Sequence, residues 1–368
     1  NEMKPDAILG STIGKLVKPT DEVSADKTDF ITVEDAKSMG YIIPDNYTSY
    51  DDNRFKSATG EYAVPRLNFD NVDKLMKAAH ENGVKLRGHT LVWHQQTPKY
   101  FFQQNYKITT GQKYNTSKEC MDTRLEFYVK TVMNHVLSSE YADCLYSYDV
   151  VNEYLHSANA EKDSKNITYW GLIYGTYDKS VKDHGVTLRP SYVKDAFKYA
   201  HEMLVKYDRL DVKLIYNDYN CYQNPENIIH LVDYINSEGK VCDGIGMQSH
   251  LDITDSFHSA TNYAKALEYF RLNCPDLEIQ ITELDATMVS TEDKPLTDED
   301  QAAYYDQIMN AILTNKKNGG NITALIIWSL YDGVSWRASS VPCLFNGLYS
   351  PKSAFFAVAN AKDAYKSK

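Results

Sequence analysis

Two glutamates each end an apolar, strand-like run of the sequence. Glu153 closes the run 146–153, and Glu283 closes the run 277–283. A carboxylate directly after a buried parallel strand faces the edge of the sheet where α/β enzymes assemble their sites. Two such carboxylates could act as an acid and as a base or nucleophile. Either glutamate alone could equally be a solvated strand-end residue, so the neighbouring residues have to decide.

An alternation of strand and helix, which begins near residue 68, positions both glutamates. Apolar side chains at 72, 75, 76 and 79 follow the helical spacing i, i+3, i+4, i+7. They predict a helix with Asp70 as its N-cap and with Gly83 ending it in a left-handed conformation. A strand at 84–89 is predicted to follow.

The same alternation continues to the end of the chain. It predicts strands at 145–153, 212–219, 243–251, 277–285 and 322–330, and helices at 121–137, 191–206, 225–237, 260–272, 298–315 and 351–365. Thr297 and Asp300 are expected to form a capping box at the start of helix 298–315.

Strands followed by helices predict an α/β fold with a parallel sheet. Neither a glycine-rich dinucleotide motif nor a Walker A motif follows the first strand, which favours a closed (β/α)8 TIM barrel over an open doubly wound sheet. We therefore interpret residues 1–368 as a single barrel domain. The irregular stretch at about 5–67 is predicted to be an enlarged loop.

Composition limits the partners that the chain could bind. With 39 basic and 50 acidic side chains the net charge is −11, which disfavours a nucleic acid partner. No apolar run reaches membrane-spanning length. The six cysteines contain no C-x-x-C pair, so buried thiols are expected in place of a zinc site, with one or two disulfides left open.

Six motifs at successive strand ends together resemble a known family. They are LRGHTLVWHQQ at 86–96, DVVNE at 149–153, YNDYN at 216–220, MQSHL at 247–251, ITELD at 281–285 and IWSL at 327–330. In this order they resemble glycoside hydrolase family 10, the endo-β-1,4-xylanases, over most of the chain. The resemblance implies a (β/α)8 barrel that hydrolyses internal β-1,4 bonds of xylan with retention of configuration, without a metal or an organic cofactor.

The resemblance also implies a role for each residue near the two glutamates. Glu153 would be the general acid/base and Glu283 the nucleophile, with carboxyl groups about 5 to 5.5 Å apart, whereas about 9 Å would indicate an inverting enzyme. Asn152 would bind the sugar 2-hydroxyl. His250 would hydrogen-bond the nucleophile, and Asp285 behind it would fix the imidazole.

Further residues match sugar-binding positions of the family: His89, Trp93, Gln96, Asn217, Tyr219, Gln248, Trp328 and Trp336. Among these, the resemblance implies that Trp93 and Trp328 form aromatic walls of the sugar-binding subsite. The resemblance implies that Trp336 and Arg337 close the last loop, although a tryptophan is often only a core residue. Tyr219 could equally be a strand-end tyrosine that satisfies its own hydroxyl. His94 is interpreted as a packing residue.

The start of the chain matches only part of a family motif. Asn1 and Lys4 fit the end of the motif Glu-Asn-x-x-Lys and would bind substrate. The first barrel strand, its helix and most of the second strand are therefore expected on a preceding segment of the same gene product.

The expected partners are xylan and xylo-oligosaccharides, without nucleic acid or membrane. Attached carbohydrate-binding modules outside this chain are left open. A secreted or cell-surface location is expected. Two alternatives stay open: a retaining β-1,4-glucanase or mixed-linkage glucanase on the same barrel, and a non-catalytic polysaccharide-binding protein.

Overall fold

The computed structural model describes residues 67, 69–106, 115–157, 168–182, 184–290, 295–348 and 350–366. Asn1, Lys4 and, apart from Leu67, the predicted loop at 5–67 lie outside the described residues. The described residues form two compact units. The first contains the described residues up to Tyr216 together with Asp233–Cys242, and the second contains Asn217–Val232 and the described residues from Asp243 onward.

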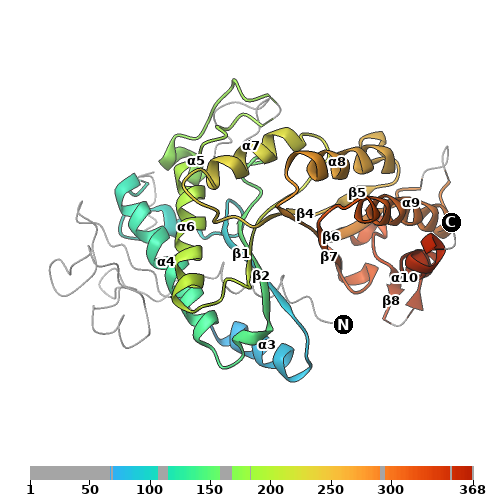
Figure 1. Cartoon of the computed structure of the whole chain (residues 1–368), viewed down its shortest axis with the longest axis horizontal. Helices are drawn as coiled ribbons and strands as arrows, with labels where there is room; N and C mark the ends of the chain where they lie inside the picture. Colours follow the sequence, from blue (N-terminus) through green and yellow to red (C-terminus); the bar gives the residue numbers. More distant parts are fainter. Residues whose placement is uncertain are drawn as a thin grey trace. The chain divides into compact units, whose positions relative to one another are not determined.

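The first unit is built on two parallel strands, coloured from blue to green in Figure 1. These are β1 (Leu86–Trp93) and β2 (Leu145–Asn152), and their register places Trp93 opposite Asn152. The helices of this unit are α3 (Asp70–Glu81), α4 (Lys118–Ser138), α5 (Tyr169–Tyr174) and α6 (Ser191–Lys206). Helix α6 packs against both α4 and β2. Because β1 and β2 pair in parallel, their carboxyl ends lie side by side.

The second unit has β6 (Glu278–Thr287) at its centre. It pairs in parallel with β4 (Gly244–Met247), β5 (His250–Asp252) and β7 (Ile322–Ile327). Helix α9 (Asp298–Lys317) packs against α8 (Ala260–Asn273) and α10 (Ser353–Lys366), and a short hairpin joins β8 (Phe345–Gly347) to β9 (Ser350–Pro351). Two further elements, β3 (Lys213–Asp218) and α7 (Pro225–Ile235), have residues in both units.

The predicted helix signals are partly confirmed. Gly83 has φ +63° and ends α3 as expected, and Thr297 forms the capping box with Asp300 at the start of α9. The prediction that Asp70 caps α3 is wrong. Phe69 occupies the N-cap position without a side-chain cap, and Asp70 is the first helical residue, where its negative charge favours the positive end of the helix dipole.

Two strand predictions need correction. The strand predicted at 84–89 begins at Leu86 and continues to Trp93, because the residues after His89 are also strand formers. The strand predicted at 243–251 is divided into β4 and β5. Ser249 has φ +61°, which takes the backbone out of the extended conformation and interrupts the strand.

Close contact between β1 and β2 depends on a glycine. The ring of Tyr148 on β2 occupies the space next to Gly88, where an added Cβ would lie 2.2 Å from a ring carbon. Tyr148 is completely buried. Only glycine leaves room for this ring, so Gly88 is required by packing.

Candidate active site

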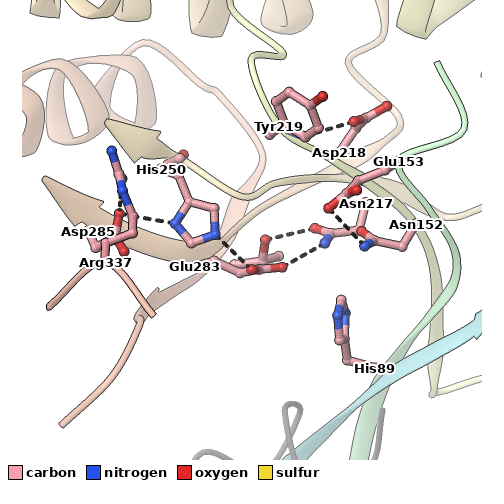
Figure 2. A network of polar contacts seen from close by, with 12 residues as sticks. His89, Asn152, Glu153, Asn217, Asp218, Tyr219, His250, Glu283, Asp285 and Arg337 are labelled. Atoms are coloured by element: carbon pink, nitrogen blue, oxygen red, sulfur yellow. Dashed lines mark hydrogen bonds and ion pairs between the residues drawn. The ribbon is translucent and has the colours of Figure 1, made fainter. Parts of the chain in front are cut away.

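In the first unit, the carboxylate of Glu153 is held by residues at the ends of β1 and β2. Glu153 directly follows β2 and is 7% exposed. The indole nitrogen of Trp93 donates a hydrogen bond to Oε2 at 2.8 Å. The amide of Asn152 donates to Oε1 at 3.2 Å, a contact drawn in Figure 2. Both carboxylate oxygens therefore have a donor from a rigid strand, which fixes the orientation of the side chain.

His94 also reaches this carboxylate. Its Nε2 lies 4.0 Å from Oε2 of Glu153, and its side chain is 14% exposed. From the sequence alone, His94 is interpreted as a packing residue, because its position within the motif at 86–96 matches no binding role of the family. Its place directly after Trp93 was the one available signal.

A buried acid behind the strand ends positions His89. Asp149 on β2 is completely buried, and its Oδ2 lies 2.9 Å from Nδ1 of His89. The guanidinium of Arg87 donates to the other oxygen, Oδ1, so that the charge of Asp149 is compensated. Neither Asp149 nor Arg87 was among the predicted site residues, although an acid and a base inside apolar runs are an unusual pattern.

In the second unit, Glu283 lies on β6 with a donor at each carboxylate oxygen (Figure 2). The amide of Asn217 donates to Oε1 at 2.9 Å, and Nε2 of His250 donates to Oε2 at 3.0 Å. Asn217 is itself oriented by the hydroxyl of Thr282, which donates to its Oδ1 at 2.7 Å. Asn217 is completely buried, and its amide donates to the Glu283 carboxylate in the structure described.

His250 lies between two carboxylates. Its Nδ1 is 3.0 Å from Oδ1 of Asp285, so the expected partner behind the imidazole is present. Burial lowers the pKa of His250, but the hydrogen bonds and negative charges of Asp285 and Glu283 outweigh burial and raise it to about 9. At neutral pH both ring nitrogens therefore carry a proton, and Glu283 faces a positive charge.

Arg337 extends this chain of charges. Its Nη1 donates to Oδ1 of Asp285 at 2.7 Å, and its Nη2 donates to the hydroxyl of Thr287 at 2.9 Å. In Figure 2 the side chains of Glu283, His250, Asp285 and Arg337 follow one another in this order. The structure thus joins the loop after β7 to the network around Glu283.

Two tryptophans contact the same imidazole. The ring centroids of Trp328 and Trp336 lie 6.1 Å and 5.5 Å from that of His250, both edge to face. Trp336 is 71% exposed, which excludes the core interpretation. Such an exposed ring beside a polar network can stack on a sugar face.

The remaining predicted binding residues occupy strand ends in their own units. Gln96 is exposed beyond β1, and Tyr219 follows β3, with its backbone nitrogen donating to Asp218. Gln248 is buried, and its backbone nitrogen donates to the carbonyl oxygen of Asp218. Their contacts with a sugar stay predictions.

Several strand ends carry non-glycine residues in the left-handed region. These residues are Gln96 after β1, Glu153 after β2, Asn220 after β3, Ser249 after β4 and Ser329 after β7, with φ between +50° and +70°. Residues other than glycine, asparagine and aspartate avoid this region. These left-handed residues therefore gather just after the carboxyl ends of parallel strands.

Neither a metal cluster nor a membrane span is found in the part of the chain that the structure describes. Across those residues, no group of three or more His, Cys, Asp and Glu side chains could hold a metal ion. None of the helices described there combines the length and the apolar character that a membrane crossing needs.

Comparison with known proteins agrees with this arrangement. The model of glycosyl hydrolase family 10 matches residues 10–361. The chain is 40% identical over 362 residues to endo-1,4-beta-xylanase A of Butyrivibrio fibrisolvens, a match that covers 98% of this chain and 74% of that protein. It is 34% identical to the bifunctional endo-1,4-beta-xylanase XylA of Ruminococcus flavefaciens, covering 80% of this chain but only 28% of the relative.

A solved structure shares the fold. The CBM22-1–GH10 modules of the Clostridium thermocellum xylanase 10B, complexed with xylohexaose, superpose with a TM-score of 0.66 at 28% identity. The match covers 87% of this chain and 58% of that one.

Proposed function

The chain belongs to glycosyl hydrolase family 10, and on this premise we propose that it is an endo-1,4-β-xylanase that cleaves internal bonds of xylan by a retaining double displacement. The family's fold is the (β/α)8 barrel, and the parallel strands and helices described here follow its order. The observation that carries the proposal is the arrangement at Glu283. Its carboxylate faces the amide of Asn217 and the protonated imidazole of His250, which favours an ionised nucleophile.

In the first step, Glu153 donates its proton to the oxygen of the scissile bond while a carboxylate oxygen of Glu283 attacks the anomeric carbon. The carbon–oxygen bond to the leaving sugar breaks, and a covalent glycosyl-enzyme forms. In the second step, the Glu153 carboxylate takes a proton from water, whose oxygen attacks the anomeric carbon and releases Glu283. The sum is addition of one water with retained configuration.

The neighbours of Glu153 suit these two tasks. Trp93 and Asn152 hold the two carboxylate oxygens, so that the same group can give a proton and later take one without reorienting. Asn152 is also the residue proposed to bind the sugar 2-hydroxyl, and His89, held by Asp149, is proposed as a further sugar ligand.

Labelling of the nucleophile tests the proposal. A 2-deoxy-2-fluoro-β-xylobioside with a dinitrophenyl leaving group should trap the glycosyl-enzyme, and peptide mass spectrometry should find the label on Glu283. Glu283→Ala should abolish turnover while the fold is retained, whereas Glu278→Gln, at the first residue of the same strand, should keep turnover. A label on another residue, or full activity of Glu283→Ala, would refute the assignment.

The substrate class needs its own comparison. Reducing-sugar release from xylan should greatly exceed release from carboxymethyl-cellulose. Proton NMR of the first products should show the β-anomer before mutarotation. Preference for the cellulose derivative would favour the glucanase alternative, and binding of xylan without products would favour the non-catalytic alternative.

We further propose that the enzyme acts outside the cell or at its surface, because polymeric xylan is too large to cross a membrane. Fractionation of a host culture, with xylanase activity assayed in each fraction, tests this location. Activity confined to the cytoplasm would contradict it. Attached carbohydrate-binding modules likewise stay a proposal.

A further inference from the structure

Arg337 occupies an unusual place for a loop arginine. It lies between β7 and β8, yet its guanidinium contacts two residues of β6, Asp285 and Thr287. Its side chain is 16% exposed, and the Asp285 side chain is completely buried. A buried carboxylate is costly unless a cation or several donors compensate it.

Asp285 receives its described donors at one oxygen. Both Nδ1 of His250 and Nη1 of Arg337 donate to Oδ1. The position of this oxygen therefore depends on both donors, and the hydrogen bond that aligns the imidazole depends on the guanidinium.

Charges alternate along the resulting chain. Glu283 is negative, His250 positive, Asp285 negative and Arg337 positive. Without Arg337 the buried chain would carry one uncompensated negative charge. Other titratable groups nearby are His258, whose pKa is lowered mainly by burial and also by Arg337, and Tyr305, whose pKa is raised by burial and by Asp285. Asp252, whose pKa is lowered, lies on β5 with His250.

The loop reaches the imidazole from a second side. Trp336, directly before Arg337, contacts the ring of His250 edge to face, and the Arg337 guanidinium lies 5.6 Å from the Trp336 ring centroid. One dipeptide thus contacts both His250 and the carboxylate that orients it.

We propose that Arg337 is a positioning residue for the nucleophile: it holds Asp285, which aligns His250, which in turn holds the Glu283 carboxylate for attack. This inference rests on the proposed function of Glu283. Arg337 acts through Asp285 and takes no part in bond making or breaking.

The test separates attack from binding. Arg337→Met should slow the first-order rate of trapping by the fluorinated xylobioside by about tenfold or more, by analogy with the loss seen when a hydrogen-bonding partner that orients a metal ligand is removed. The concentration for half-maximal trapping rate should change little. Arg337→Lys should recover part of the rate, and added guanidinium, far below unfolding concentrations, should partly rescue Arg337→Met, whereas urea should not.

A matched control and a folding control accompany these variants. Arg271→Met removes an arginine that is paired with Glu268 on α8 and should leave trapping unchanged. Thr287→Val removes the second contact of Arg337 but no charge, and should have a smaller effect. Circular dichroism gives the folded fraction, to which all rates are normalised.

Additivity decides whether Arg337 acts through Asp285. In Asp285→Asn, the further change Arg337→Met should cost much less than it does in the wild type. Additive losses, an unchanged rate in Arg337→Met, or a loss that disappears on normalisation would overturn the inference. If wild-type enzyme itself forms no adduct at Glu283, the proposed function fails instead.

Discussion

At the scale of single residues, the indole of Trp93 is the direct partner of the Glu153 carboxylate, at 2.8 Å. The resemblance gave this tryptophan only the role of an aromatic wall. The hydrogen bond adds a second role, orientation of the acid. The two roles can be separated by mutation, because phenylalanine keeps the aromatic ring but lacks the N–H that donates the hydrogen bond.

We expect Trp93→Phe to slow hydrolysis of unactivated xylo-oligosaccharides by about 10- to 100-fold, corresponding to about 1.5–3 kcal/mol for a hydrogen bond to a charged group. Formation of the glycosyl-enzyme from dinitrophenyl xylobioside should change less, because that leaving group needs no proton. Steady-state kinetics on the oligosaccharide and pre-steady-state kinetics on the aryl glycoside measure the difference. Equal losses would show that Trp93 does not act through the acid.

His250 links the charge network to stability. Its pKa is raised from 6.5 to about 9, so the folded state binds this proton more tightly than the unfolded state. The resulting stabilisation is fully present below about pH 6.5 and is lost as pH rises through about 9. The melting temperature of the wild type relative to His250→Gln, measured by calorimetry from pH 6 to 10, should therefore fall as pH rises. A constant difference would contradict a protonated native imidazole.

The sequence predicted that the two glutamates, His250 and Asp285 belong to the candidate site, because each stands at a fixed position in a strand-end motif. The contacts of His94 and Arg337 could not be predicted in the same way. The contact of Arg337 depends on how the loop after β7 returns to β6, and the contact of His94 depends on the side-chain orientation of the residue directly after β1. A linear pattern contains neither.

At the scale of elements, β1 and β2 fit together through Gly88 and Tyr148. An alanine at 88 would place its Cβ 2.2 Å from the tyrosine ring, far inside contact distance. Since Gly88 precedes Trp93 on β1 and Tyr148 lies on the strand that leads to Glu153, displacement of either strand would also disturb the hydrogen bond between Trp93 and Glu153.

Gly88→Ala should therefore destabilise the protein by about 1–3 kcal/mol or more through overpacking, and should reduce activity as well. Urea unfolding measures the loss. Gly83→Ala is the matched control, because no atom lies within 4 Å of its added Cβ and only the left-handed backbone opposes it. Tyr148→Leu combined with Gly88→Ala should recover part of the stability. Wild-type stability of Gly88→Ala would contradict the packing argument.

Helix periodicity predicted the main helices to within a few residues, and capping chemistry located the start of α9. Strand limits were less predictable. The break at Ser249 arises from a backbone conformation for which serine carries no signal, whereas the extension of β1 to Trp93 agrees with the strand-forming residues after His89.

At the scale of the whole molecule, the six cysteines form no disulfide. All six lie in the part of the chain that the structure describes, and five of them are buried. The disulfides that the sequence left open are therefore absent. Burial also raises the pKa of the Cys144 thiol to about 11, which keeps it in the unreactive protonated form.

We expect Ellman's reagent to titrate at most the partly exposed Cys274 in the native enzyme and all six thiols after unfolding. The reducing agent dithiothreitol should leave the melting temperature unchanged, because there is no disulfide for it to cleave. Fewer than six thiols in the unfolded protein, or a lower melting temperature with the reductant, would show that a disulfide forms.

The alternating pattern predicted the fold class, and the interpretation of residues 1–368 as one barrel domain stays a prediction beside the two compact units. The boundary passes through β3 and α7, inside elements whose periodicity is uninterrupted. Sequence periodicity shows where a strand or helix begins and ends. It does not show which unit the individual residues of that element contact.

The left-handed backbone at Glu153 implies a trade-off between durability and turnover. At φ +57° a glutamate is held in a conformation that glycine or asparagine would adopt at less cost. Glu153→Gly should therefore recover about 1 kcal/mol at the backbone, offset by loss of the bonds from Trp93 and Asn152, and Glu153→Asn should show the same tendency. Because the backbone gain and the lost hydrogen bonds oppose each other, a thermal-stability screen blind to activity selects for this glutamate less strongly than its chemistry requires, so stabilised libraries of this enzyme need an activity readout in every round.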